Sequence, residues 1–144
     1  MRYVILWSVG FATRLHGHDR NTDDLDMWIE DTVENRRNLR NSFRELGQGD
    51  LVSLETMQFL PGGTSFYVGA GIELDIMTSM KGLEQYTFSE CLEKASHANF
   101  EGINVPFLHI NHLIDNKKVV NRLKDQDDVR ELEKIKKLCE QEGE

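Results

Sequence analysis

Alternation of apolar and polar residues is clearest in two segments, which it predicts to be β-strands. From Asp24 to Glu30, the odd-numbered residues are apolar and share one face, while Asp24 and Asp26 lie on the other. Ile72 to Thr78 alternates in the same way and places Asp75 on its polar face. Both segments therefore predict strands with one apolar face and with carboxylates on the other.

Apolar runs, helical periodicity and capping signals predict the other elements. Further strands are expected over Tyr3–Val9, Ser65–Val68 and Ile103–His109, the last with Pro106 at a sheet edge, and Leu51–Leu60 is an ambiguous, strand-like stretch. Two helices are expected to begin at capping boxes, one from Asp31–Glu34 to Leu46 and one from Thr87–Glu90 to about His97. The other helices are expected over Phe11–His16, Asn111–Arg122 and about Gln126–Cys139. This pattern predicts an α/β (α+β) fold, a small mixed β-sheet with helices packed on it. We expect one domain over residues 1–144, with the sheet in about 1–80 and a helical part in about 85–144.

Charge and composition narrow the possible partners. The formal net charge of -8 argues against broad, non-specific binding of nucleic acid. A phosphate substrate would have to meet local positive groups, because the overall field opposes its approach. No apolar run approaches the roughly 20 residues of a membrane span, and residues 1–7 make a poor signal peptide. We therefore expect a cytoplasmic protein with no membrane partner.

The carboxylates are the strongest chemical signal. Residues i and i+2 of a strand lie about 6.6 Å apart at their Cα atoms, so Asp24 and Asp26 repel unless a cation lies between them or one is protonated. Mg²⁺ prefers carboxylate and phosphate oxygens. If the strand of Asp75 is the neighbour, three carboxylates converge, enough for a two-metal site acting at phosphorus. The alternative is that Asp-x-Asp is a common string on exposed strand faces and carries no function.

The loop before these aspartates could bind an anion. Gly10 stands at a strand-to-helix turn, where backbone N–H groups and a helix N-terminus would face a phosphate. Arg20 and Thr22 add two more donors just before the carboxylates. Each also has a structural interpretation, because Arg20 could pair with an acid such as Asp23 and Thr22 could fix the turn through its hydroxyl.

Two residue strings resemble a known family. The first is Gly10-x-Ala12-x-x-x-His16-Gly17-x-x-Arg20-x-Thr22-x-Asp24-Leu25-Asp26, and the second is Leu113-Ile114-x-x-Lys117-x-x-x-x-Arg122-x-Lys124-Asp125-x-x-Asp128. Together they resemble the small nucleotidyltransferases of the polymerase-beta-like superfamily, closest to the bacterial group that contains the abortive-infection type toxins. The resemblance spans the chain from Tyr3 to about Leu138 and implies a nucleotidyltransferase-like fold.

The resemblance also implies roles for individual residues. Asp24, Asp26 and Asp75 would hold Mg²⁺ or Mn²⁺, and Asp75 would act as the base for the attacking hydroxyl or hold that hydroxyl on a metal. Nucleotide binding would fall to Gly10, Arg20, Thr22 and Lys117. Asp125 and Asp128 would orient Lys117 or the last helices. The implied reaction moves a nucleoside monophosphate from an NTP, with ATP the expected one, to a hydroxyl acceptor and releases pyrophosphate. The acceptor stays open among an antibiotic-like small molecule, a tRNA 3′ end and a protein side chain.

The first string departs from the family at Val9, where a small residue usually precedes Gly10. A valine keeps the backbone from the close approach that glycine allows, which predicts weaker or lost triphosphate binding. The departure favours a second hypothesis: a non-catalytic binding or regulatory module with this fold, for example in a toxin–antitoxin system, with an antitoxin or a second copy of the chain as partner. A third is a phosphohydrolase or nuclease that uses the same carboxylates.

Overall fold

The described part of the chain forms one mixed six-stranded sheet with helices on both faces. The structure is a computed structural model and describes residues 1–6, 24–69 and 72–141. Along the sheet the strand order is β3-β4-β2-β1-β6-β5. The strands are β1 (Tyr3–Leu6), β2 (Asp24–Ile29), β3 (Thr64–Tyr67), β4 (Glu73–Met77), β5 (Ser96–Phe100) and β6 (Ile103–Phe107). The described helices are α2 (Val33–Glu45), α3 (Phe88–Glu93), α4 (Ile110–Val120), α5 (Leu123–Gln141) and the 3₁₀ helix η1 (Val52–Glu55). The predicted α/β class is confirmed.

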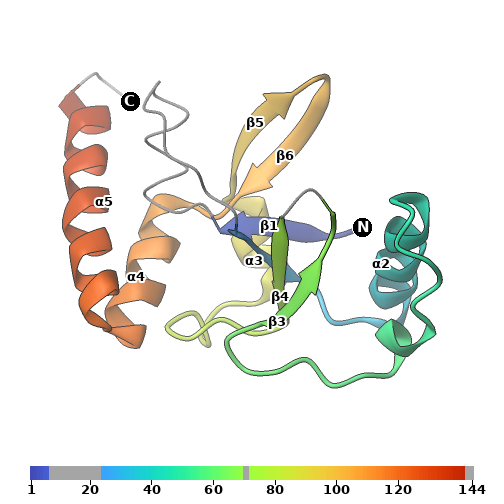
Figure 1. Cartoon of the computed structure of the whole chain (residues 1–144). Helices are drawn as coiled ribbons and strands as arrows, with labels where there is room; N and C mark the ends of the chain where they lie inside the picture. The colour runs from blue at the N-terminus through green and yellow to red at the C-terminus, as the bar shows by residue number, and fades with distance from the viewer. Residues whose placement is uncertain (7–23, 70–71, 142–144) are drawn as a thin grey trace.

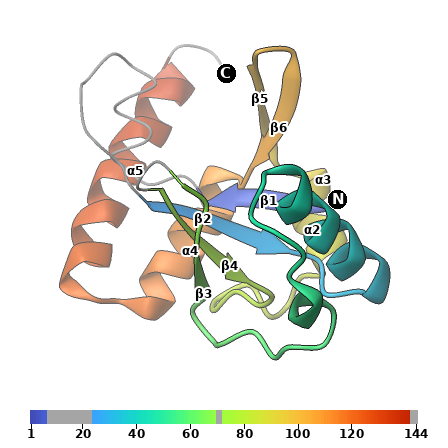
Figure 2. The ribbon, with the colours of Figure 1, turned by 45° about the vertical axis from the view of Figure 1, so that its right-hand side comes forward.

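Each face of the sheet has its own apolar core. On one face, Met27 and Ile29 pack with Leu39 and Phe43 of α2. On the other, residues of β1, β2 and β4 pack with α3, α4 and α5, and Leu132 of α5 is fully buried there. Figures 1 and 2 show α2 and the α4–α5 pair on opposite sides of the sheet. The alternation of β2 therefore sorts its side chains between two cores, as the sequence predicts.

Strands β2 and β4 are parallel neighbours in the middle of the sheet, although they are not consecutive in the chain. Parallel neighbours require a crossover, and α2 with η1 makes it on one face before β3 returns antiparallel to β4. Strand β1 pairs with β2 on the other side, antiparallel. This topology sets the polar faces of β2 and β4 side by side.

Several predicted helix boundaries are wrong by a few residues. The cap of α2 is Thr32, whose side chain accepts a hydrogen bond from Asn35 N at 3.1 Å, because Thr32 is the extended residue before the helix. The cap of α4 is His109, two residues before the expected Asn111, and its Nδ1 accepts a hydrogen bond from Asn111 N at 3.1 Å. Helix α5 begins at Leu123, ahead of the expected start.

The stretch from Leu51 to Leu60 is not a strand, and the second capping box does not lead to a long helix. Leu54 is buried within η1, and the guanidinium of Arg36 donates to the carbonyls of Leu54 and Met57, which fixes this segment without sheet pairing. Thr87 and Glu90 do form the predicted capping box of α3, but α3 ends at Glu93.

The residues after α3 form an unpredicted hairpin of β5 and β6, which projects from the body of the fold in Figure 1. Its turn, Glu101-Gly102, has φ of 52° and 85°, the positive values of a tight hairpin turn. The expectation that Pro106 marks an edge is wrong, since β6 lies between β5 and β1. The recorded pairing of β1 with β6 joins Ile5 and Phe107 and leaves Pro106 outside that ladder.

Helix α5 packs against the sheet through only part of its length. Val129 and Leu132 are buried, whereas Cys139 is exposed near the helix end. No described helix combines the length and the apolar content that a membrane span requires.

Candidate functional site

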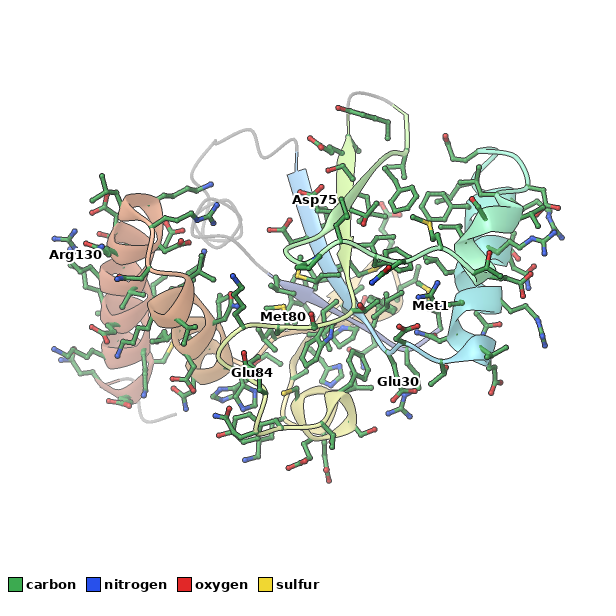
Figure 3. The ribbon with its side chains drawn as sticks, turned by 90° about the horizontal axis from the view of Figure 1, so that it is seen from below. Met1, Glu30, Asp75, Met80, Glu84 and Arg130 are labelled. Atoms are coloured by element: carbon green, nitrogen blue, oxygen red, sulfur yellow. The ribbon has the colours of Figure 1, made fainter. Side chains whose placement is uncertain are left out.

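Asp26 and Asp75 lie directly opposite each other on the two central parallel strands. They are Cα partners in the register of β2 with β4, so their backbones are about 4.8 Å apart. Both side chains are half-buried and share the face that α4 and α5 flank. Figure 3 shows Asp75 beside β2, at the end of that strand away from Glu30. The condition set by the sequence, that the two strands be neighbours, is met.

The rest of the predicted site is only partly described. The backbone of Asp24 pairs with Glu73 in the same register, but its side chain lies outside the described residues, as do Val9, Gly10, Arg20 and Thr22. Among the described side chains, no three His, Cys, Asp or Glu residues are grouped to hold a metal ion. The three-carboxylate site therefore stays a prediction, of which the structure places the Asp26–Asp75 half.

Ser65 is a site residue that the sequence reading missed. It lies opposite Asp75 in the antiparallel register of β3 with β4, and its hydroxyl donates a hydrogen bond to Asp75 Oδ1 at 2.5 Å. The four strands thus align Leu6, Asp26, Asp75 and Ser65 across the sheet. The register of β3 was the missing information, because residue type alone does not distinguish Ser65 from other strand serines.

Trp28, two residues after Asp26 on the same face, is a core residue. It is 5% exposed and makes an edge-on contact with Phe88 of α3, with 5.0 Å between ring centroids. Its Nε1 has no hydrogen-bond partner among the described residues. The polar face of β2 therefore changes within two residues from a carboxylate to a packed aromatic side chain.

Lys117 lies in a partly buried cluster of charges between α4 and α5. Its Nζ is 2.9 Å from Asp128 Oδ2 and 3.8 Å from Asp125 Oδ1. The Lys117 side chain is 15% exposed and that of Asp125 only 2%. Asp125 and Asp128 thus contact Lys117, as expected of residues that orient it, and both carboxylates neutralise its charge.

Arg122 belongs to the same cluster through Asp125. Its Nε donates to Asp125 Oδ2 at 2.7 Å, and its backbone N–H donates to the same oxygen at 3.0 Å. The hydrogen bond to Asp125 raises the pKa of Arg122, and the charge of Asp26 contributes in the same direction. The hydrogen bond from Arg122 in turn lowers the pKa of Asp125, against the effect of burial. Arg122 is part of the second residue string, but the resemblance implies no role for it.

Two hollows lie near this region of the described structure, and neither contains the carboxylate pair. An apolar groove of about 440 Å³ runs between α2 and the sheet, on the face opposite Asp26 and Asp75. A polar hollow of about 340 Å³ between α4 and α5 is lined by Lys117, Lys118 and Arg130, among others. The candidate site is therefore defined by the position of the carboxylate pair and not by a cavity.

Comparison with known proteins adds no assignment. No protein-family model matches the chain, and a search of curated proteins also finds no match. The resemblance to small nucleotidyltransferases therefore rests on the two residue strings, and its functional consequences are proposals.

Proposed function

We propose that the protein is a metal-dependent nucleotidyltransferase that moves a nucleoside monophosphate from an NTP to a hydroxyl acceptor. The observation that carries the proposal is the pairing of Asp26 with Asp75 on parallel neighbouring strands. Two carboxylates at this spacing on one face repel each other unless a cation or a proton lies between them. An oxygen-only pair beside an expected phosphate loop suits Mg²⁺ or Mn²⁺.

The residues would divide the work as follows. Asp26 and Asp75, with Asp24, would hold the metal, which when bound would neutralise charge on the phosphates. The acceptor oxygen forms a bond to the α-phosphorus, and the bond to the bridging oxygen of the β-phosphate breaks. Pyrophosphate leaves, and Asp75 accepts the proton of the acceptor hydroxyl. The protein contributes mainly position and charge, with no covalent intermediate.

One positive group supports a phosphate substrate despite the net charge of -8. The Arg122 side chain is 68% exposed, and the charge of Asp26 contributes to its raised pKa, of which the hydrogen bond to Asp125 is the main cause. We propose Arg122 as a phosphate contact beside the expected Arg20 and Gly10. Lys117 would act through the cluster with Asp125 and Asp128.

Labelled nucleotides test this proposal. The purified protein is incubated with Mg²⁺, each NTP in turn, and small-molecule, RNA and protein fractions of a cell extract. Transfer puts label from the α-phosphate into an acceptor and label from the γ-phosphate into pyrophosphate. Asp75→Asn should abolish transfer. Asp127→Asn, on the exposed side of α5, should leave it unchanged. Release of free nucleoside monophosphate without an acceptor would instead support a phosphohydrolase.

One observation favours a non-catalytic module as the second candidate. Lys117 is largely buried and is paired with two carboxylates of α5, so its charge serves the packing of the helices. A module that only uses the fold would keep this cluster and would consume no nucleotide in the same incubation. Consumption that depends on Asp75 would exclude it.

A further inference from the structure

The outer strand β3 holds Asp75 from the side away from Asp26. Ser65 is exposed, and its hydroxyl donates to Asp75 Oδ1 at 2.5 Å. Among the described residues, none makes a recorded hydrogen bond to the other oxygen, Oδ2. One carboxylate oxygen of Asp75 is therefore bound from the β3 side, opposite to the side on which β2 carries Asp26.

The turn before β3 is built to bring Ser65 to this position. Gly63 has a φ of 117°, and a Cβ placed there would lie 3.6 Å from Asp75 Cβ. Thr64 Oγ1 accepts a hydrogen bond from Leu60 N at 2.9 Å and closes the turn. A glycine is needed here because its backbone adopts this angle without strain. The turn therefore packs against Asp75 and sets the register in which Ser65 faces it.

We propose that Ser65 is the positioning residue for Asp75 in cation binding. This rests on the proposed function, in which Asp75 is a metal ligand. A carboxylate with a free side-chain torsion would turn away from Asp26 to reduce repulsion, and the hydrogen bond from Ser65 opposes that rotation. Hydrogen bonds of this kind to metal-binding carboxylates orient the ligand, and their loss typically weakens metal binding or activity by about 10- to 100-fold.

The alternative is that the Ser65–Asp75 bond only stabilises the edge of the sheet. These two roles of the hydrogen bond predict different effects when it is removed. A stabilising bond would change the unfolding temperature when removed, whatever ligand is present. A positioning bond would change cation affinity with little effect on unfolding, because Ser65 is exposed and loses no buried contact.

Isothermal titration of Mn²⁺ into the full chain separates these readings without any assay of transfer. The variants are Ser65→Ala, which removes the hydroxyl, and Ser65→Thr, which retains it in a residue that suits a strand. Ser96→Ala is the matched control, because Ser96 is an exposed serine on β5 at the opposite edge of the sheet. Asp75→Asn serves as the reference for a lost ligand. Thermal unfolding of each metal-free variant is measured in parallel.

We expect Ser65→Ala to weaken Mn²⁺ binding by about tenfold or more, with Ser65→Thr and Ser96→Ala within about twofold of wild type. Wild-type affinity in Ser65→Ala, together with lost affinity in Asp75→Asn, would overturn the role of Ser65 and leave the proposed function intact. A lower unfolding temperature with unchanged affinity would likewise assign Ser65 to the sheet edge. No Mn²⁺ binding by wild type would contradict the proposed function and the Ser65 role together.

Discussion

Replacing Asp125 by alanine should destabilise the α4–α5 pair, because it removes the most deeply buried carboxylate of the charge cluster between the two helices. The Asp125 side chain is 2% exposed and accepts three hydrogen bonds from Arg122, one of them from the backbone N–H at the start of α5. Lys117 Nζ lies 3.8 Å away. The substitution therefore removes a helix cap and one of two counter-charges of a largely buried ammonium group.

The expected loss in the free energy of unfolding follows from these contacts. Loss of the cap costs about 1 kcal/mol. The side-chain pair with Arg122 adds up to about 1 kcal/mol, because the Arg122 side chain is 68% exposed and screened by water. Partial loss of the Lys117 partner adds about another 1 kcal/mol. We expect a total of about 2–3 kcal/mol for Asp125→Ala, and about 1–2 kcal/mol for Asp125→Asn, which retains an acceptor for the backbone N–H.

Urea unfolding followed by circular dichroism at neutral pH measures this difference. Asp127→Ala is the matched control, because Asp127 lies in the first part of the same helix, is 74% exposed and pairs only with the exposed Arg130 among the described residues. It should change the free energy of unfolding by less than about 0.5 kcal/mol. Equal losses in the two variants would refute the argument that the buried cluster stabilises the helix pair.

The pH dependence of the free energy of unfolding gives an independent check on the contribution of Asp125. Because the pKa of Asp125 is lowered in the folded protein, its stabilising effect is complete above the pKa of the unfolded chain. The stabilising effect is lost as the pH falls below about 4 and then through the lower pKa that Asp125 has in the folded protein. The gap between wild type and Asp125→Ala should narrow over that range.

Three further predictions concern other parts of the fold. Burial lowers the pKa of His112, which is 5% exposed, so the free energy of unfolding should fall as the pH drops below about 6.5. The unfolding temperature should therefore differ less between pH 7.5 and pH 5.5 in His112→Phe than in wild type. Gly82→Ala should lower the free energy of unfolding by more than about 2 kcal/mol, because its Cβ would lie 2.8 Å from the carbonyl oxygen of Asp115. Gly102→Ala is the control: Gly102 has a similar φ but open space around it, so the loss in urea unfolding should be about 1 kcal/mol. Thr87→Ala should lose about 1 kcal/mol by removing the α3 cap, and no loss would contradict the capping box.

The strands that carry the carboxylates could be predicted from sequence because each has one strictly apolar face. Met27 and Ile76 both pack in the core under α2, which fixes the faces of β2 and β4 and hence the side on which Asp26 and Asp75 lie. The neighbouring position of these strands could only be stated as a condition. It depends on the crossover through α2, a long-range feature that local periodicity does not encode.

The missed features depend on pairing or on packing at a distance. Strand β5 is short and polar, and its pattern of apolar and polar residues would suit the end of a helix equally well. Its pairing with β6 through a tight turn makes it a strand. Ser65 reaches Asp75 through the register of β3 with β4. Site residues held by their own strand were therefore predictable, and those brought in by a neighbouring element were not.

The most direct test of the central claim is calorimetric titration of NTP with Mg²⁺ into wild type and Asp26→Ala. We predict that wild type binds nucleotide only in the presence of Mg²⁺ and that Asp26→Ala loses this binding, while the thermal unfolding of the metal-free variant stays close to that of wild type. Absence of Mg²⁺-dependent binding to wild type, or equal binding by both proteins, would contradict the assignment of Asp26 and Asp75 as the centre of a nucleotidyl-transfer site.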